Sequence, residues 1–112
     1  MLSAAHCTRR YGGGTNITKL YVVVGEHDTS YNDGERYCKV CKSFEHPEYI
    51  GKPEFDYDYG ILILCEHLTW SKEVSPVCLP DKESNYEGHN AIASGWGKLA
   101  KNGNQPVKLQ KA

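Results

Sequence analysis

The chain has 112 residues, enough for one small domain, and its 39% hydrophobic content with eight tyrosines indicates an ordered globular protein rather than a disordered one. Its net charge of −1 provides no basic surface for nucleic acid or an anionic membrane, so neither is expected as a partner. No apolar run is long enough to cross a membrane as a helix.

Short β-type segments separated by turns follow one another along the chain. No segment shows sustained apolar spacing at i, i+3, i+4 and i+7, so we predict no long helix. Runs of β-branched, aromatic and other apolar residues between turn-forming residues predict strands at 19–27, 37–44, 60–64 and 91–97. Short strands at such intervals are typical of an all-β sandwich or barrel.

Two of these strands carry a prediction about their faces. In the strand at 37–44, alternation places Cys38, Val40 and Phe44 on one face, which we take as the inward one, and Cys41 on the other. The strand at 60–64, "GILIL", is apolar without alternation, which predicts cover on both of its faces.

The cysteines indicate where the protein is located. Five cysteines in a chain of this length are typical of extracellular, disulfide-bonded proteins, and their odd number leaves at least one thiol without a partner in the chain. The residues after Met1 contain neither the basic nor the apolar region of a signal peptide. Together these features predict an internal piece of a longer protein that is secreted to the extracellular space. A cytosolic protein with free thiols is the alternative.

The first candidate for chemistry is His6, which lies among small residues in "LSAAHC". A histidine held in one orientation is suited to act as a general base, and a carboxylate usually fixes its tautomer by accepting a hydrogen bond from Nδ1. Asp58 is the candidate for that carboxylate, because it precedes the strand at 60–64 and is expected to be partly desolvated. Asp56 lies further into the loop and is expected to be solvated.

Several segments resemble, in order, those of the chymotrypsin/trypsin family of serine proteases. "LSAAHC" resembles the family's histidine motif and "DYGILIL" resembles its aspartate motif. "HPEY", "SPVCLP", "SGWG" and "QPVKLQKA" resemble further family segments, so the resemblance covers the whole chain. It implies an all-β, trypsin-like fold of two six-stranded antiparallel β-barrels. The implied parts are most of the first barrel at about 1–70, the interdomain connection at about 71–90 and the start of the second barrel at about 91–112.

The same resemblance implies a secreted serine endopeptidase that hydrolyses protein or peptide substrates through a Ser-His-Asp triad, with His6 and Asp58 as its catalytic residues. The family's Gly-Asp-Ser-Gly-Gly-Pro segment, which carries the nucleophile, does not occur in the 112 residues. We therefore expect the serine to lie beyond Ala112 and the 112 residues alone to be inactive. No cofactor is required. The alternative is a non-catalytic protease homologue that acts as a binding or regulatory module.

The resemblance also implies that Cys7 pairs with a cysteine before Met1, and that Cys78 pairs outside the chain, toward a pro-region or the distal carboxy-terminal part. For the remaining cysteines it implies nothing. Cys41 points away from the inward face and Cys65 lies just past the neighbouring strand, so we predict a Cys41–Cys65 disulfide, with unpaired core thiols as the alternative. "CKVC" has the spacing of zinc ligands, but no second such pair follows it.

The turn "GEHDTSYNDGE" at 25–35 resembles the calcium-binding loop of trypsins, in which glutamates flank the loop at both ends, although this loop is one residue shorter. Calcium takes six to eight oxygen ligands, so a structural calcium ion is a candidate ligand of this loop, and an ordinary solvated hairpin loop is the other interpretation. The candidate ligands are Glu26, Asp28, Tyr31, Asp33 and Glu35.

Two smaller assignments complete the chain. Asn16 begins an N-glycosylation sequon, Asn-Ile-Thr, and is the candidate glycosylation site. The remaining histidines have no ligand partner at a useful spacing, and the sequence assigns no role to His27, His46, His67 or His89.

Overall fold

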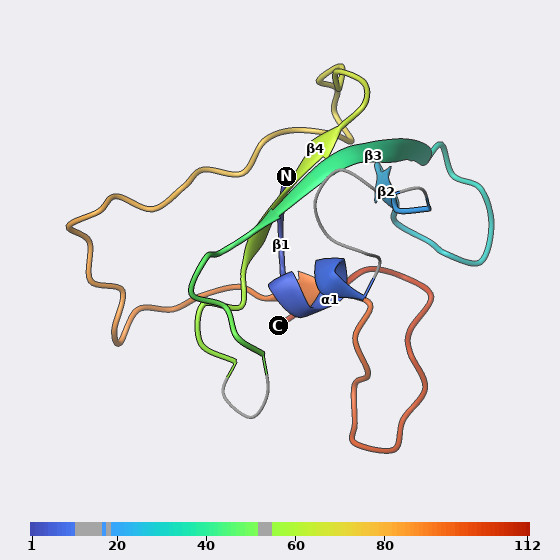
Figure 1. Ribbon diagram of the computed structural model, residues 1–112. Coiled ribbons are helices and arrows are strands. Elements are labelled where there is room, and N and C mark those ends of the chain that lie inside the picture. The colour runs from blue at the N-terminus through green and yellow to red at the C-terminus, as the bar shows by residue number, and fades with distance from the viewer. Residues whose placement is uncertain (11–16, 18, 52–54) are drawn as a thin grey trace. The chain divides into compact units, whose positions relative to one another are not determined.

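The computed structural model describes residues 1–10, 17, 19–51 and 55–112 (Figure 1). Its elements are β1 (Leu2–Ser3), α1 (Ala5–Arg9), β2 (Tyr21–Val24), β3 (Arg36–Glu45), β4 (Gly60–Leu64), β5 (Ser94–Gly95) and β6 (Gln110–Lys111). The single helix among the described residues has five residues, so the predicted all-β class is confirmed. The described residues contain no helix that is long and apolar enough to cross a membrane.

The chain divides into two compact units. The first comprises Met1–Val24 and Arg36–Thr69, and the second comprises Gly25–Glu35 and Trp70–Ala112. The first unit contains a four-stranded antiparallel sheet in the order β1-β4-β3-β2, in which the long β3 lies between β4 and β2 (Figure 1). The second contains a two-stranded antiparallel sheet, β5-β6.

The core of the first unit lies against one face of its sheet. Its buried members are Ile17, Val22, Val40 and Leu62, and the half-buried Leu20, Val24 and Leu64 pack around them. All are β-branched or aliphatic, most of them from β2, β3 and β4, and full burial of such a side chain stabilises the fold by about 1.5–3 kcal/mol relative to exposure. The strand prediction at 19–27 therefore located a real strand, although only Tyr21–Val24 pair with β3.

The inward face predicted for the third strand is wrong at one position. Cys38 and Val40 are buried as expected, but Phe44 is 57% exposed and Ser43 is buried in its place. The reason is a β-bulge. Val40 pairs with Leu64 and Lys42 pairs with Ile63, which leaves Cys41 as an extra residue and reverses the alternation beyond it.

The prediction that β4 is covered on both faces is also wrong. Gly60 and Leu62 are buried, whereas Ile61 and Ile63 are 42% and 43% exposed. Because successive side chains of a strand point to opposite faces, only one face of β4 meets the core. Gly60 is required for another reason, since a Cβ atom there would lie 2.7 Å from the carbonyl oxygen of Phe44.

The second unit is held by hydrogen bonds between its two segments. His27 accepts a hydrogen bond from the Leu109 amide at 2.9 Å and another from Trp96 Nε1 at 3.3 Å, both through its carbonyl oxygen. The Thr29 amide donates to the Val107 carbonyl at 2.9 Å. The strand predicted at 91–97 is shorter than expected, because within it only Ser94–Gly95 pair with β6.

Candidate active site

His6 lies in the short helix α1, which follows β1 directly. Ala4 precedes the helix in extended conformation, and its carbonyl oxygen accepts hydrogen bonds from the amides of Cys7 and Thr8. Ala5 and Thr8 are buried, and the Thr8 hydroxyl donates to the Ala5 carbonyl at 2.9 Å. The small side chains let the helix pack closely against the sheet, so the His6 side chain, 53% exposed, projects from the opposite side.

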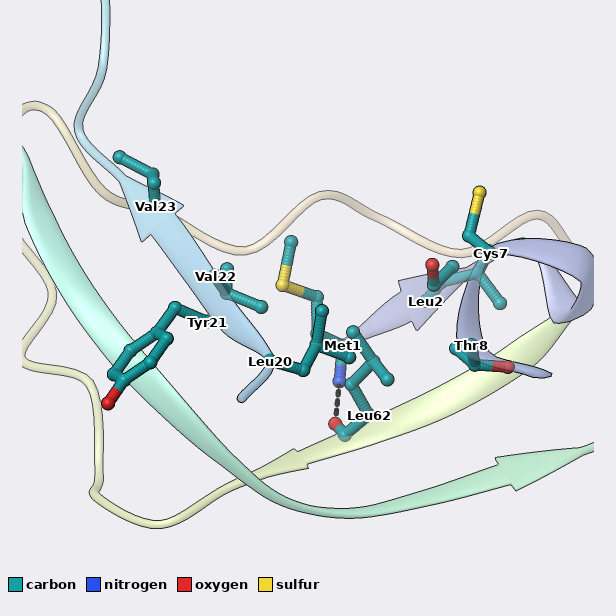
Figure 2. A pocket seen from close by; sticks show the side chains of 10 residues that line it. Met1, Leu2, Cys7, Thr8, Leu20, Tyr21, Val22, Val23 and Leu62 are labelled. Carbon is teal, nitrogen blue, oxygen red and sulfur yellow. Dashed lines mark hydrogen bonds between the residues drawn. The ribbon is translucent and has the colours of Figure 1, made fainter. Parts of the chain in front are cut away.

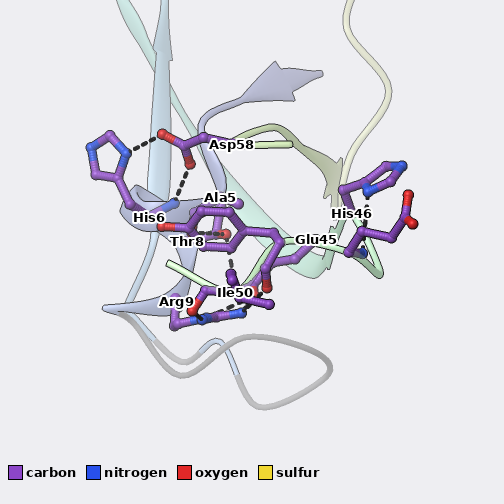
Figure 3. Close-up of polar contacts among 10 residues, drawn as sticks. Ala5, His6, Thr8, Arg9, Glu45, His46, Ile50 and Asp58 are labelled. Atoms are coloured by element: carbon purple, nitrogen blue, oxygen red, sulfur yellow. Dashed lines mark hydrogen bonds and ion pairs between the residues drawn. The ribbon is translucent and has the colours of Figure 1, made fainter. Parts of the chain in front are cut away.

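Asp58 holds His6 at two points (Figure 3). Its Oδ2 lies 2.6 Å from the ring atom Nδ1, and its Oδ1 accepts the His6 backbone amide at 2.8 Å. An ionised carboxylate only accepts hydrogen bonds, so Nδ1 carries the proton and Nε2 is left with its lone pair. The arrangement therefore presents Nε2 as a base in a fixed orientation.

The pKa of Asp58 is lowered from its ordinary value of 3.8. The hydrogen bond from the His6 side chain is the main cause, and the His6 backbone amide adds to it, while partial burial acts in the opposite direction. The carboxylate is therefore ionised at neutral pH. The stability that this contact contributes is present above pH 3.8 and is lost as the pH falls through the lowered pKa.

Arg9 ties the helix of His6 to the segment after β3 (Figure 3). Its Nε donates to Glu45 Oε2 at 3.0 Å and its Nη2 donates to the Tyr49 carbonyl at 3.0 Å. The guanidinium also lies 4.6 Å from the centre of the Tyr49 ring. Sequence reasoning missed this residue, because no local pattern relates Arg9 to a carboxylate 36 positions later.

The segment before Asp58 also lies beside His6. Phe55 contacts the His6 ring edge-to-face, with ring centroids 5.9 Å apart. Asp56 is exposed, in line with the expectation that it is solvated. The predicted glycosylation site, Asn16, lies outside the described residues.

The predicted disulfide between Cys41 and Cys65 is confirmed, with Cα atoms 4.9 Å apart. Cys38 is buried in the core, while Cys7 and Cys78 are exposed and form no disulfide with any described residue. Cys7 Sγ lies 3.3 Å from His6 Nε2. Partners outside the chain for Cys7 and Cys78 remain predictions.

A cavity of about 280 Å³ lies beside Cys7, between the two outer strands of the sheet, β1 and β2 (Figure 2). Most of the side chains around it are apolar, among them Leu2, Val22 and Leu62. The amino group of Met1 donates to the Leu62 carbonyl at 2.8 Å on its wall. Nothing in this apolar lining suggests a catalytic role, and we assign it none.

The acidic loop at 25–35 is held by hydrogen bonds within itself. Asp28 is buried, and its Oδ1 accepts hydrogen bonds from the amide and hydroxyl of Ser30. Asp33 accepts the Asp28 amide and Glu35 accepts the Asp33 amide, while the Tyr31 side chain is exposed. In the described part of the chain, no three His, Cys, Asp or Glu side chains converge as a metal ion would require.

One feature of this loop still favours a ligand. Among the residues that the structure describes, Oε1 of Glu26 is buried without a hydrogen-bond partner, and such an orphaned oxygen is costly unless a cation or water satisfies it. The loop as folded does not form a complete oxygen cage, so calcium binding here stays a prediction.

We expect calcium to raise the melting temperature of the complete protein, since an ion that binds only the native state stabilises it by about 2.7 kcal/mol at a hundredfold excess over Kd. Melting with millimolar calcium and again with chelator measures this. The Glu26→Gln, Glu35→Gln variant should lose the shift, and Glu66→Gln with Glu83→Gln, two exposed glutamates outside the loop, should keep it. Equal melting temperatures with calcium and chelator would leave the loop as a solvated hairpin.

The hydrogen bonds between Asp28 and Ser30 should also make the stability of the protein sensitive to acid. Hydrogen bonds from the Ser30 side chain and backbone lower its pKa from the ordinary 3.8, so its stabilisation is present above pH 3.8 and is lost below it. We expect the unfolding free energy of Asp28→Asn to depend less steeply on pH below 3.8 than that of the unchanged protein. Denaturant unfolding across a pH series measures the slope. The control is Asp56→Asn, at an exposed aspartate, and the same slope in both variants would contradict the prediction.

Comparison with known proteins agrees with this geometry. The family model for trypsin matches residues 1–112. A venom serine protease of Polistes dominula is 37% identical over 117 residues, covering 99% of this chain and 40% of that protein. Trypsin-1 of Astacus astacus is 37% identical over 112 residues, covering 98% of this chain and 46% of that protein.

A solved structure described as "Structure of GrC" has the same fold, with a TM-score of 0.82 at 24% identity, and covers 99% of this chain and 46% of that one. The predicted trypsin-like fold is therefore confirmed. The chain spans less than half the length of these relatives. A family model that matches every residue and two relatives above one-third identity show that the chain belongs to the trypsin family of serine proteases.

Proposed function

We propose that these 112 residues are the histidine- and aspartate-bearing part of a secreted serine endopeptidase. His6 is the general base, Asp58 orients it, and the nucleophilic serine comes from sequence beyond Ala112. The observation that carries the proposal is the contact of 2.6 Å between His6 Nδ1 and Asp58 Oδ2, which leaves Nε2 available as a base. The relatives named as proteases support protein or peptide substrates.

The chemistry follows from the two contacts of Asp58. Nε2 of His6 accepts the proton of the serine hydroxyl as its oxygen attacks the substrate carbonyl, and the ring becomes an imidazolium. Asp58 stabilises that positive charge through Nδ1, and its bond to the His6 amide keeps the carboxylate in place. The same histidine then donates the proton to the leaving amine. The trypsin family of serine proteases is the reference case for such a triad.

The chain would then contribute to both barrels of the trypsin-like fold. The first barrel extends over about 1–70, the connection over about 71–90, and the second barrel begins at about 91. The 112 residues alone are inactive, because they carry neither the nucleophile nor the amides that stabilise its oxyanion. Cys78 joins the chain to a pro-region or the distal carboxy-terminal part.

The test is labelling of the complete protein with a fluorophosphonate, which reacts with an activated serine. We expect one labelled serine, in a peptide beyond Ala112, and no label on the 112-residue chain alone. Pretreatment with an unlabelled fluorophosphonate should prevent both labelling and peptide hydrolysis. A complete protein that melts cooperatively but takes no label would instead be a non-catalytic homologue.

A further inference from the structure

The turn that carries Asp58 has an unfavourable backbone conformation. Tyr57 has a φ of +56°, in the left-handed region that bulky residues rarely adopt. The Tyr59 amide donates to the Tyr57 carbonyl at 2.7 Å, closing a three-residue turn around Asp58. Strained positions of this kind persist only where surrounding contacts hold them, so the contacts of Tyr57 and Tyr59 bear on Asp58.

One side chain, His46, contacts both tyrosines. The His46 ring stacks on the Tyr57 ring, with centroids 4.7 Å apart and planes 9° apart, and lies 4.8 Å from the Tyr59 ring. The His46 amide also donates to the Tyr59 carbonyl at 3.1 Å. Tyr57 and Tyr59 are 48% and 46% exposed, so about half of each side chain is covered, and the His46 imidazole forms part of that cover.

His46 is itself fixed from the opposite direction. It follows the last residue of β3, Glu45, which binds Arg9 on the helix of His6. Its Nδ1 accepts the Glu48 amide at 3.2 Å, which sets the plane of the ring (Figure 3). One short segment, 45–50, therefore contacts the helix that carries His6 and the turn that carries Asp58.

We propose that His46 is a positioning residue of the active site. Its ring stacks on Tyr57 and lies against Tyr59, holds the turn in which Tyr57 is left-handed, and so keeps the Asp58 carboxylate against His6. This inference rests on the proposed function for its effect on catalysis, but not for its effect on the position of Asp58. The ring acts through its flat face, so a phenyl ring should replace most of its effect.

The experiment uses the complete protein and two readouts. The first is kcat and KM for a peptide substrate. The second is the low-field proton resonance of Nδ1–H in the His6–Asp58 hydrogen bond, which reports the contact whether or not the protein hydrolyses peptides. Because small displacements of a catalytic group cost up to about 100-fold, His46→Ala is expected to lower kcat by roughly 10- to 100-fold with little change in KM. The low-field resonance should weaken or disappear.

Three further variants separate positioning from general destabilisation. His46→Phe should restore most of kcat and the resonance. In a Tyr57→Gly background, His46→Ala should cost less than threefold, because glycine adopts a positive φ without support. His89→Ala is the matched control, since its ring contacts Tyr86, 6.0 Å away, in the second unit.

The outcomes are distinct. An unchanged resonance and kcat in His46→Ala would overturn the inference, as would an equal loss in the Tyr57→Gly background. If the unsubstituted protein hydrolyses no peptide, the proposed function fails, and the resonance in the same variants decides the positioning role alone.

Discussion

Replacement of His6 by alanine in the complete protein is expected to lower kcat/KM for peptide hydrolysis by about 10²–10⁴-fold, the range that positioned general base catalysis contributes. The variant loses Nε2, the atom to which the proposed function assigns the proton of the serine, and the substitution alters no other group of the proposed triad. Initial rates with a chromogenic peptide measure the loss.

The fold should tolerate this change. The His6 side chain is 53% exposed and packs little against the core, so the unfolding free energy should change little. His67→Ala, at an exposed histidine of the same unit, is the matched control and should retain full activity. Asp58→Asn should also lose activity, because the amide cannot hold the same tautomer and charge. A His6→Ala protein that keeps more than a tenth of the activity would exclude His6 as the base.

Removal of the disulfide is expected to have the largest effect on stability. Cys41 and Cys65 are 24 positions apart, and closing a loop of that length restricts the unfolded chain by about 3.5 kcal/mol. The Cys41→Ser, Cys65→Ser double variant should lose roughly that much unfolding free energy. Equilibrium denaturation in urea, at a protein concentration that avoids aggregation, measures the change.

The position of the disulfide gives a reason to expect most of this loss. Cys41 is the extra residue of the β3 bulge, where the ladder to β4 is interrupted, and Cys65 follows β4, with its amide bonded to the Lys39 carbonyl at 2.9 Å. The crosslink thus joins the two strands where the bulge interrupts their ladder. Lys42→Ser, an exposed change beside the bulge, is the control and should cost under about 0.5 kcal/mol. A loss below 1 kcal/mol in the double variant would show that backbone pairing alone keeps the strands in register.

The β-class and the pair His6–Asp58 could be predicted because each depends on local pattern. β-branched runs between turn residues predict strands without knowledge of their partners, and the short motifs around His6 and Asp58 are contiguous in sequence. The Cys41–Cys65 disulfide was also within reach, since it required only that Cys41 point outward and that the two strands be neighbours. Cys41 is exposed and β3 pairs with β4, so the bulge at Cys41 did not affect either requirement.

The outward position of Phe44 and the role proposed for His46 were decided by tertiary structure. Alternation along β3 predicts the face of Phe44 only while the ladder is regular, and the bulge arises from pairing with β4, which the sequence of β3 does not contain. The stacking of His46 on Tyr57 joins residues 11 positions apart, and it exists because the chain turns back beside the end of β3. Local sequence was enough to select His6 and Asp58 as candidates, because their motifs are contiguous. Their arrangement in space depends on contacts between segments far apart in the chain, and no periodic pattern in the sequence encodes those contacts.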